Sequence, residues 1–188
     1  MANSYRRTLS LITIICLQLT SCGDQSVPTI ETGKPVSTTA SQSEVDPLAP
    51  RYKSNWREGI DFRRPGYPEF LAEVQGMSST QELWGRRSNG TLTLFRFKQP
   101  LPKQFTLVIK GGALGPNIGK PVRIKVGDTT KDITFVSDPL SRPERYHLDF
   151  TQNTSANTIE FIIPQLPALT MIDNPESGIG LISLSIKK

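Results

Sequence analysis

Apolar and polar side chains alternate along most of the second half of the chain. The alternation is clear in five segments: 105–110, 122–126, 146–150, 159–163 and 182–186. A strand places successive side chains on opposite faces, and one apolar face with one polar face is typical of antiparallel sheets. No window of a dozen residues carries a convincing 3.6-residue stripe. The pattern therefore predicts an all-β domain.

Turn-forming residues separate these segments and add two more strands. Residues 88–90 read Ser-Asn-Gly and precede a predicted strand over Thr91–Phe97. Residues 126–128 read Val-Gly-Asp and predict a hairpin that leads into a strand over Ile133–Val136. Short strands at this spacing predict an antiparallel β-sandwich of jelly-roll type, with about seven to nine strands, over residues 51–188.

The first 22 residues have the pattern of an export signal. Two arginines precede an apolar stretch at 9–17, which is shorter than the roughly 20 residues that a membrane-spanning helix needs. The stretch leads to Leu-Thr-Ser-Cys at 19–22, which resembles the bacterial lipoprotein box. The resemblance implies that residues 1–21 are a signal peptide and that lipid on Cys22 anchors the chain to a membrane. A plain secretory signal with a chance cysteine is the alternative.

Residues 22–50 are predicted to be the lipidated cysteine and a disordered tether. This segment is rich in Ser, Thr and Pro, and it cannot bury enough apolar surface to offset the entropy of ordering. A lipoprotein box places the chain in the bacterial cell envelope. Gly23 stands where an Asp commonly retains lipoproteins at the inner membrane, so the outer membrane, facing the periplasm, is favoured. Asp24 leaves the inner membrane open.

Few residues of the chain are of the types that act in catalysis or bind a metal ion. The chain has two cysteines and one histidine, too few for a tetrahedral zinc site of the usual Cys/His kind. His147 lies on the polar side of a predicted strand, and Asp149 follows on the same side. We interpret them as surface residues rather than as a catalytic base with its orienting carboxylate. The sequence predicts no catalytic residue, no metal and no cofactor.

Charge and glycine patterns do not point to nucleotides or nucleic acid. The glycine-rich run at 111–119 lacks the Gly-Lys-Ser/Thr of a phosphate loop and is interpreted as a strand end and a turn. The formal net charge is +5, and a solvated surface explains it at least as well as an anionic partner does. The arginine pairs at 63–64 and 86–87 have no alternating aromatic residues, so no nucleic-acid partner is expected.

A sugar-binding site would need an aromatic face with polar groups beside it. The candidates are Tyr52, Trp56, Tyr67 and Trp84. Trp56 stands where the tether becomes the domain and is expected to be a packing lid. For Trp84, a place in the core and a place in a ligand site are equally open.

Longer motifs make the segment 59–188 similar to a known family. They are Ile-Asp-Phe-Arg-Arg-Pro-Gly-Tyr-Pro at 60–68, Leu-Trp-Gly-Arg at 83–86, Gly-Pro-Asn-Ile-Gly-Lys-Pro-Val at 115–122 and Gly-Ile-Gly-Leu-Ile at 178–182. The segment resembles the carboxyl-terminal β-sandwich domain, of unknown function, of bacterial membrane phosphoglycerol transferases and some family 2 glycosyltransferases. It departs from that family at Arg87, where an aromatic residue is expected, and at 173–177, which lacks an Asp-x-Arg. The resemblance implies an envelope-glycan context without the transferase's catalytic domain.

These observations favour a lipid-anchored, non-catalytic envelope module. Its expected partners are the membrane, through the lipid, and an envelope glycan or a glycan-modifying membrane protein. If it binds glycan, the candidate contacts are Trp84 by stacking, Arg86 by a charge-assisted hydrogen bond and Asn117 through its amide. The first alternative is a structural or protein-interaction lipoprotein with no small ligand. The second is a hydrolase that uses His147 with a carboxylate.

Overall fold

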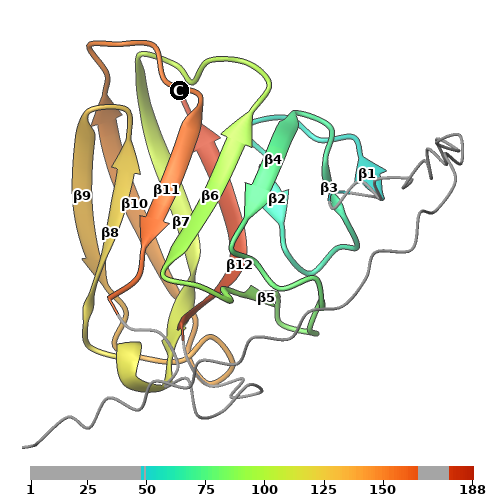
Figure 1. Ribbon diagram of the computed structural model, residues 1–188, viewed down its shortest axis with the longest axis vertical. Helices are drawn as coiled ribbons and strands as arrows, with labels where there is room; N and C mark the ends of the chain where they lie inside the picture. Colours follow the sequence, from blue (N-terminus) through green and yellow to red (C-terminus); the bar gives the residue numbers. More distant parts are fainter. Residues whose placement is uncertain (1–47, 49, 165–177) are drawn as a thin grey trace, which may run out of the picture. The chain divides into compact units, whose positions relative to one another are not determined.

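The computed structural model describes residues 48, 50–164 and 178–188, and strands dominate these residues (Figure 1). Four strands have two residues each: β1 (Arg51–Tyr52), β2 (Ile60–Asp61), β3 (Tyr67–Pro68) and β5 (Arg86–Arg87). The longer strands are β4 (Leu71–Gln75), β6 (Leu92–Phe97), β7 (Gln104–Leu114), β8 (Pro121–Val126), β9 (Thr129–Thr134), β10 (Glu144–Thr151), β11 (Thr158–Ile162) and β12 (Gly178–Lys187). A short 3-10 helix, η1 (Gly115–Asn117), follows β7. The predicted all-β fold is confirmed.

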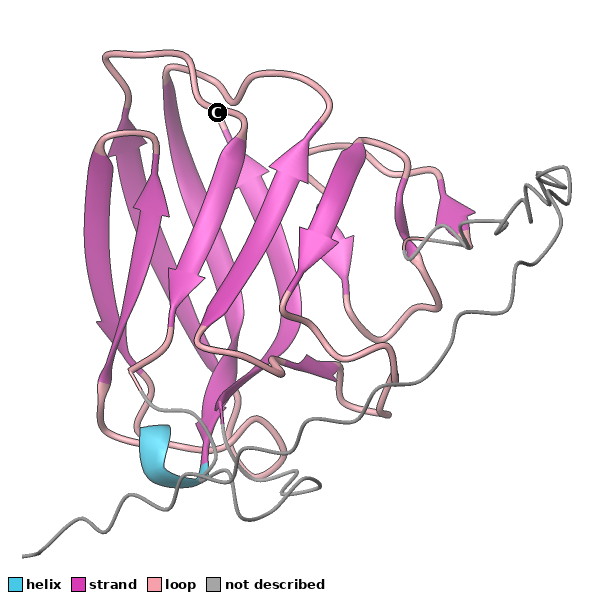
Figure 2. Cartoon of the chain, in the orientation of Figure 1, coloured by secondary structure: helices cyan, strands magenta, loops and turns pink. Residues whose placement is uncertain are grey.

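The strands form two five-stranded sheets that lie face to face (Figure 2). The first sheet has the order β10-β7-β12-β2, and β5 also pairs with β12. The second has the order β4-β6-β11-β8-β9. β1 and β3 form a small two-stranded sheet of their own. The chain enters the first sheet at β2 and the second at β4, returns to the first at β5 and reaches the second again at β6. It then changes sheet before β7, β8, β10, β11 and β12. This connectivity is the predicted jelly roll, with β4 added at the edge beside β6.

The core lies between the sheets because the apolar positions of each strand face inward. On β8, Val122, Ile124 and Val126 are fully buried, whereas Arg123 and Lys125 are exposed. Aromatic rings on the inner face of the second sheet also pack against each other in the core. Phe95 packs edge-on against Phe161 with a centroid distance of 5.9 Å. The alternation in the sequence therefore marks the buried face correctly.

The hairpin at Gly127 forms as predicted, but β9 begins earlier than expected. Val126 pairs with Thr129, and Gly127 has a φ of +54°, which suits glycine. β9 runs over Thr129–Thr134 instead of Ile133–Val136. Its first inward positions are Thr129 and Lys131, both polar, so the hydropathy pattern does not reveal them.

The folded domain includes residues before position 51. The side chain of Leu48 is 2% exposed and belongs to the hydrophobic core. The carbonyl of Pro50 accepts a hydrogen bond from the Tyr67 amide at 3.1 Å. The predicted signal peptide, Cys22, most of the predicted tether and the motif at 173–177 lie outside the described residues. Within the described part, no helix is long and apolar enough to cross a membrane.

Candidate functional site: an open depression beside Trp84

Trp84 lines an open depression of about 470 Å³ at one end of the first sheet. The depression is formed by the segment leading into β5, the end of β7 with the start of η1, and the loop between β9 and β10. Its lining residues are Glu82, Trp84, Arg87, Leu114, Gly115, Asp138 and Leu140. Trp84 itself is half-buried. The surface thus combines one indole with two carboxylates and a guanidinium.

Two paired glycines let Trp84 lie flat against the sheet. Gly180 on β12 pairs with Gly112 on β7. A Cβ atom on Gly180 would come within 2.5 Å of the Trp84 ring and 2.6 Å of the Pro139 ring. A Cβ atom on Gly112 would lie 2.5 Å from the backbone nitrogen of Pro139. The absence of side chains at these positions therefore makes room for the indole and for the loop that carries Asp138.

Hydrogen bonds hold the segment of Trp84 against β12. The Ser88 amide donates to the Ile179 carbonyl at 2.8 Å, and the Ile179 amide donates to the Ser88 hydroxyl at 2.9 Å. Gly85 has a φ of +155°, and a Cβ atom there would lie 2.1 Å from the Leu181 carbonyl oxygen. The Trp-Gly-Arg motif thus needs its glycine for a close approach of two backbones.

The polar groups of the depression are held in place by neighbours. Arg87 donates through Nε to Glu82 Oε1 at 2.6 Å and forms an ion pair with it. Asp138 accepts hydrogen bonds from the amides of Leu140 and Ser141 at 2.9 and 2.8 Å. The Ser141 hydroxyl, followed by these amides, holds the pKa of Asp138 below its usual value. The carboxylate of Asp138 therefore presents charged, oriented oxygen atoms at neutral pH, and that of Glu82 is held in place by its ion pair with Arg87.

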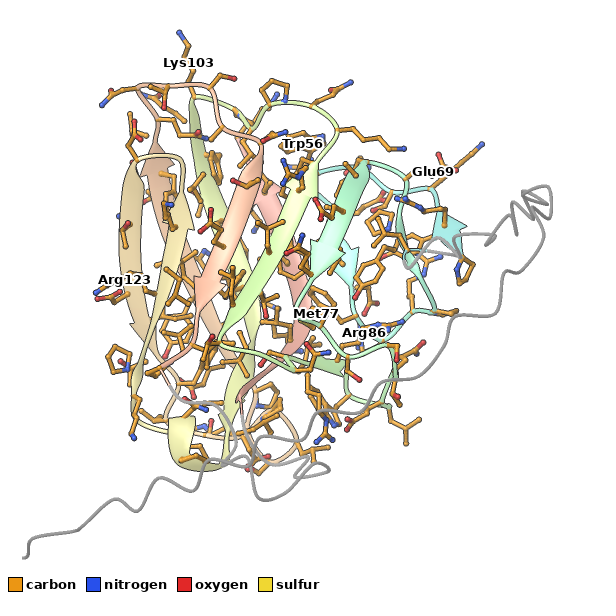
Figure 3. All side chains as sticks on the ribbon, in the orientation of Figure 1. Trp56, Glu69, Met77, Arg86, Lys103 and Arg123 are labelled. Atoms are coloured by element: carbon orange, nitrogen blue, oxygen red, sulfur yellow. The ribbon has the colours of Figure 1, made fainter. Side chains whose placement is uncertain are left out.

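Arg86 does not belong to this depression. Its side chain is 5% exposed and lies on the side of Tyr67 and Met77, where Figure 3 labels it beside Met77. Nη1 donates to the carbonyls of Ser78 and Ser79 at 3.1 and 2.8 Å. Arg86 therefore lines a second pocket, and the structure separates it from Trp84 although only Gly85 lies between them in the sequence.

Asn117 lies in η1 and is fully buried. Gly115 of the same turn lines the Trp84 depression, whereas Asn117 is enclosed by the protein. Of the three candidate glycan contacts, Trp84 alone reaches the depression, whereas Arg86 lines a separate pocket and Asn117 is buried.

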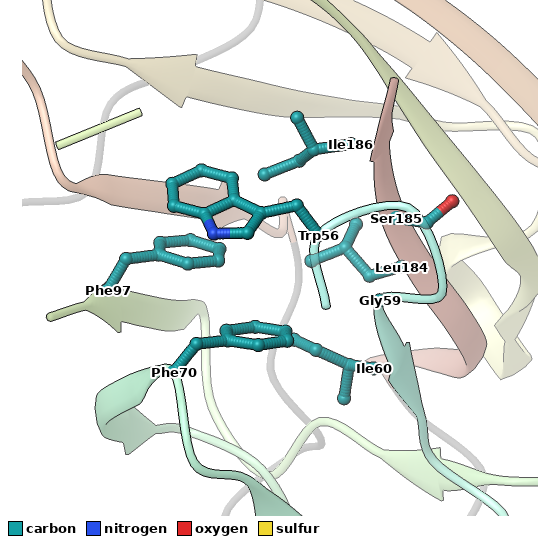
Figure 4. A pocket seen from close by; sticks show the side chains of 8 residues that line it. All are labelled: Trp56, Gly59, Ile60, Phe70, Phe97, Leu184, Ser185 and Ile186. Carbon is teal, nitrogen blue, oxygen red and sulfur yellow. The ribbon is translucent and has the colours of Figure 1, made fainter. Parts of the chain in front are cut away.

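Trp56 closes a corner of the core, as expected of a packing lid (Figure 4). Its ring stacks on Phe97 with a centroid distance of 5.4 Å and lies 6.3 Å from the ring of Phe70. The cavity under it measures about 10 Å³ and is lined almost entirely by apolar side chains. Such a cavity is about large enough for one water molecule and too small for a sugar ring.

His147 is exposed on β10, in register with Val108 of β7. Asp149 is also exposed and accepts a hydrogen bond from the Thr106 hydroxyl at 2.5 Å. Both side chains thus lie on the outer face of the first sheet. Among the described residues, no three His, Cys, Asp or Glu side chains gather closely enough to hold a metal ion.

The sequence did not indicate three polar residues of the depression. In the sequence, Arg87 is notable only as part of an arginine pair and as a departure from the family motif. No strand spacing predicts its ion pair with Glu82. Asp138 comes from a loop remote in sequence from Trp84. Its turn reads Asp-Pro-Leu-Ser, and this turn-like composition is the one local signal that could have found it.

The comparisons with known proteins decide the family. Residues 44–188 match the family described as Domain of unknown function (DUF7024). The chain belongs to the DUF7024 family. It is 32% identical over 145 residues to Phosphoglycerol transferase I of Salmonella typhimurium, and equally similar to that of Salmonella typhi. The match covers 72% of this chain and 18% of the relative, so the DUF7024 chain spans less than a fifth of the proteins that it resembles.

A solved structure of a family 29 carbohydrate-binding module is also similar. It shares 16% sequence identity, with a TM-score of 0.43, and covers 68% of this chain and 84% of that one. So distant a likeness says nothing about a ligand of the DUF7024 chain. The similarity to the phosphoglycerol transferases confirms the resemblance found in the sequence motifs.

Proposed function

We propose that this DUF7024 chain is a non-catalytic module of the bacterial cell envelope that binds glycan in the Trp84 depression. The proposal depends on one observation: the half-buried indole of Trp84 packs against Gly180, and charged side chains line the depression beside it. An aromatic face can pack against the apolar face of a sugar ring, and a few oriented polar groups can then bind its hydroxyls. The match to a segment of phosphoglycerol transferases supports an envelope-glycan context.

The two tryptophans make the proposal testable by fluorescence in the full chain. Trp56→Phe leaves Trp84 as the only indole, because the chain contains two tryptophans, and it keeps an aromatic ring in the core corner. An array of bacterial envelope oligosaccharides would supply a binding sugar. We expect this sugar to change the emission of the Trp56→Phe variant, and to leave that of Trp84→Phe almost unchanged.

Affinity measurements give the complementary result. Trp84→Leu should weaken binding by on the order of tenfold, which corresponds to about 1.4 kcal/mol of lost aromatic contact. His147→Ala is the control and should bind like the wild type. An unchanged affinity in a folded Trp84→Leu variant would refute the site, and a loss of function in folded His147→Ala would favour the hydrolase alternative.

We also propose that lipid on Cys22 anchors the chain, with the outer membrane as the favoured location. Support comes from the sequence pattern at 19–22. Cys22→Ala should release the chain from membranes or leave an uncleaved precursor, as seen by fractionation and mass spectrometry. A wild-type chain that stays soluble and carries no acyl mass on Cys22 would rule out the lipoprotein assignment. Sucrose-gradient separation of the two membranes tests the location.

Protein docking at the same end of the domain is the second candidate function. Leu83 is fully exposed, and Leu140, which lines the depression, is 68% exposed. Exposed apolar side chains beside a depression also suit a protein partner. Leu83→Ser should leave sugar affinity nearly unchanged if glycan is the ligand, because Leu83 does not line the depression. If it instead abolishes cross-linking of the chain to an envelope protein, docking is the better assignment.

A further inference from the structure

Arg86 is a buried positive charge without a carboxylate partner among the described residues. Its side chain is 5% exposed, and its polar contacts are the carbonyls of Ser78 and Ser79 and the face of the Tyr67 ring, 5.2 Å from the guanidinium carbon. Burying a charge is costly unless an opposite charge or a full set of hydrogen bonds compensates it. The compensation here is incomplete.

One edge of this guanidinium carries no hydrogen bond. Nε of Arg86 is buried and has no partner, and both carbonyls are bound by Nη1, which leaves Nη2 without an acceptor in the described part of the chain. Arg63 shows what this edge can do. Its Nε and Nη2 donate to the two oxygens of Asp61 at 2.9 and 3.0 Å. The Nε/Nη2 edge of an arginine is suited to bind two oxygens of one anion.

The pocket that Arg86 lines is open and large enough for a small anion. Its volume is about 380 Å³, and Tyr67, Ser78, Ser79 and Gln81 are among its lining residues. The positive charge of Arg86 affects the pKa of the nearby Tyr67 phenol. Burial raises the pKa of Tyr67, and the charge of Arg86 acts against this rise. The guanidinium of Arg64 lies 4.3 Å from the ring centre of Tyr52. Burial raises the pKa of Tyr52, and the charges of Arg64 and Arg86 both act against this rise.

We propose that this pocket binds an oxyanion, a phosphate or carboxylate group of a ligand, at the free edge of Arg86. Nη2 would meet the anion first, and a small movement of the pocket wall would bring Nε into the same bidentate contact. The proposal does not depend on glycan binding at Trp84, because the two pockets have no lining residue in common.

The side-chain Nε–H signals of ¹⁵N-labelled full chain provide a direct test. Inorganic phosphate and glucuronate are titrated separately at constant ionic strength, and Arg86→Lys assigns the Arg86 signal. We expect that signal to shift and saturate with one or both anions, while the signal of Arg63 stays in place. Saturation with phosphate alone identifies a phosphate site, and saturation with glucuronate alone identifies a carboxylate site. If neither anion shifts the Arg86 signal more than that of Arg63, the proposal is wrong.

A charge placed at the pocket gives a second test that leaves the buried arginine intact. Gln81→Glu adds a carboxylate to the pocket lining at an exposed position, and it should weaken anion binding by on the order of tenfold. Gln104→Glu adds the same charge at an exposed position of β7 that does not line the pocket, and it is the matched control. Equal affinities in the two variants would overturn the proposal. Trp84→Leu should keep the anion response, which separates this test from the glycan test.

Discussion

The two tryptophans differ in what their rings pack on, although each also borders an open depression of about 470 Å³. Trp56 covers an apolar corner in which the free volume is about 10 Å³, and its ring stacks on Phe97. Trp84 rests on Gly180 beside a depression of about 470 Å³ that contains charged groups. Both side chains are half-buried, so exposure alone does not separate a packing lid from a ligand platform. What lies around the ring decides between them.

The contrast has an energetic consequence. Removing a ring from a filled apolar corner leaves a cavity, and its surroundings lose many contacts at once. Removing a ring that borders an open depression lets water enter without creating a void. Stability should therefore depend on Trp56, whereas recognition should depend on Trp84.

The largest expected effect is the loss of stability in Trp56→Ala. We expect the free energy of unfolding to fall by roughly 3 kcal/mol, because the variant removes the ring that packs beside Phe70 and Phe97. Trp84→Ala should cost about 1 kcal/mol or less, since its ring borders an open depression. Urea denaturation of the two full-chain variants measures the difference. Equal losses of stability in the two variants would contradict the interpretation that Trp56 is a packing residue and Trp84 a ligand-binding residue.

A smaller effect is expected when a side chain is added at Gly180, against which the Trp84 ring packs. Gly180→Ala places a methyl group within 2.5 Å of the indole, so the ring must move, at a cost of roughly 1–3 kcal/mol. The emission of Trp84 in the Trp56→Phe background should change, and sugar binding should weaken. Gly90→Ala is the control, because its Cβ atom would lie 3.8 Å from the nearest atom. A response of Trp56 as large as that of Trp84 would contradict the local character of the site.

The smallest expected effect is a pH response confined to the Trp84 depression. The Ser141 hydroxyl and neighbouring amides lower the pKa of Asp138 below its ordinary value of 3.8. The turn is therefore stabilised by the ionised carboxylate at any pH above that value, and the stabilisation is lost as the pH falls through the lower folded value. Emission from Trp84 should change there, whereas Trp56 should not respond.

Asp138→Asn serves as the control for the pH experiment, since the amide does not titrate. In the Trp56→Phe background this substitution should remove the acid response of Trp84. A response that persists in Asp138→Asn would show that another group, and not the turn at 138–141, controls the depression at low pH.

The sequence by itself determined the fold class and the family. Alternation along β7, β8, β10 and β12 marks their buried faces, because the period of two is a local property of every strand. The hairpin at Gly127 is equally local. The motif at 115–122, which contains Asn117, is a run of neighbouring residues and can be compared directly. None of these inferences needs a contact between distant parts of the chain.

The tertiary structure decided which candidate residues share a site. Trp84 and Arg86 are neighbours in sequence, but Trp84 packs on Gly180 of β12, whereas Arg86 turns toward Tyr67. Two-residue strands such as β5 are too short to show a period, and their partners lie on β12, far along the chain. The direction of a side chain at such a position depends on which distant backbone pairs with it. That pairing is a property of the packed sheets, and no local pattern in the sequence encodes it.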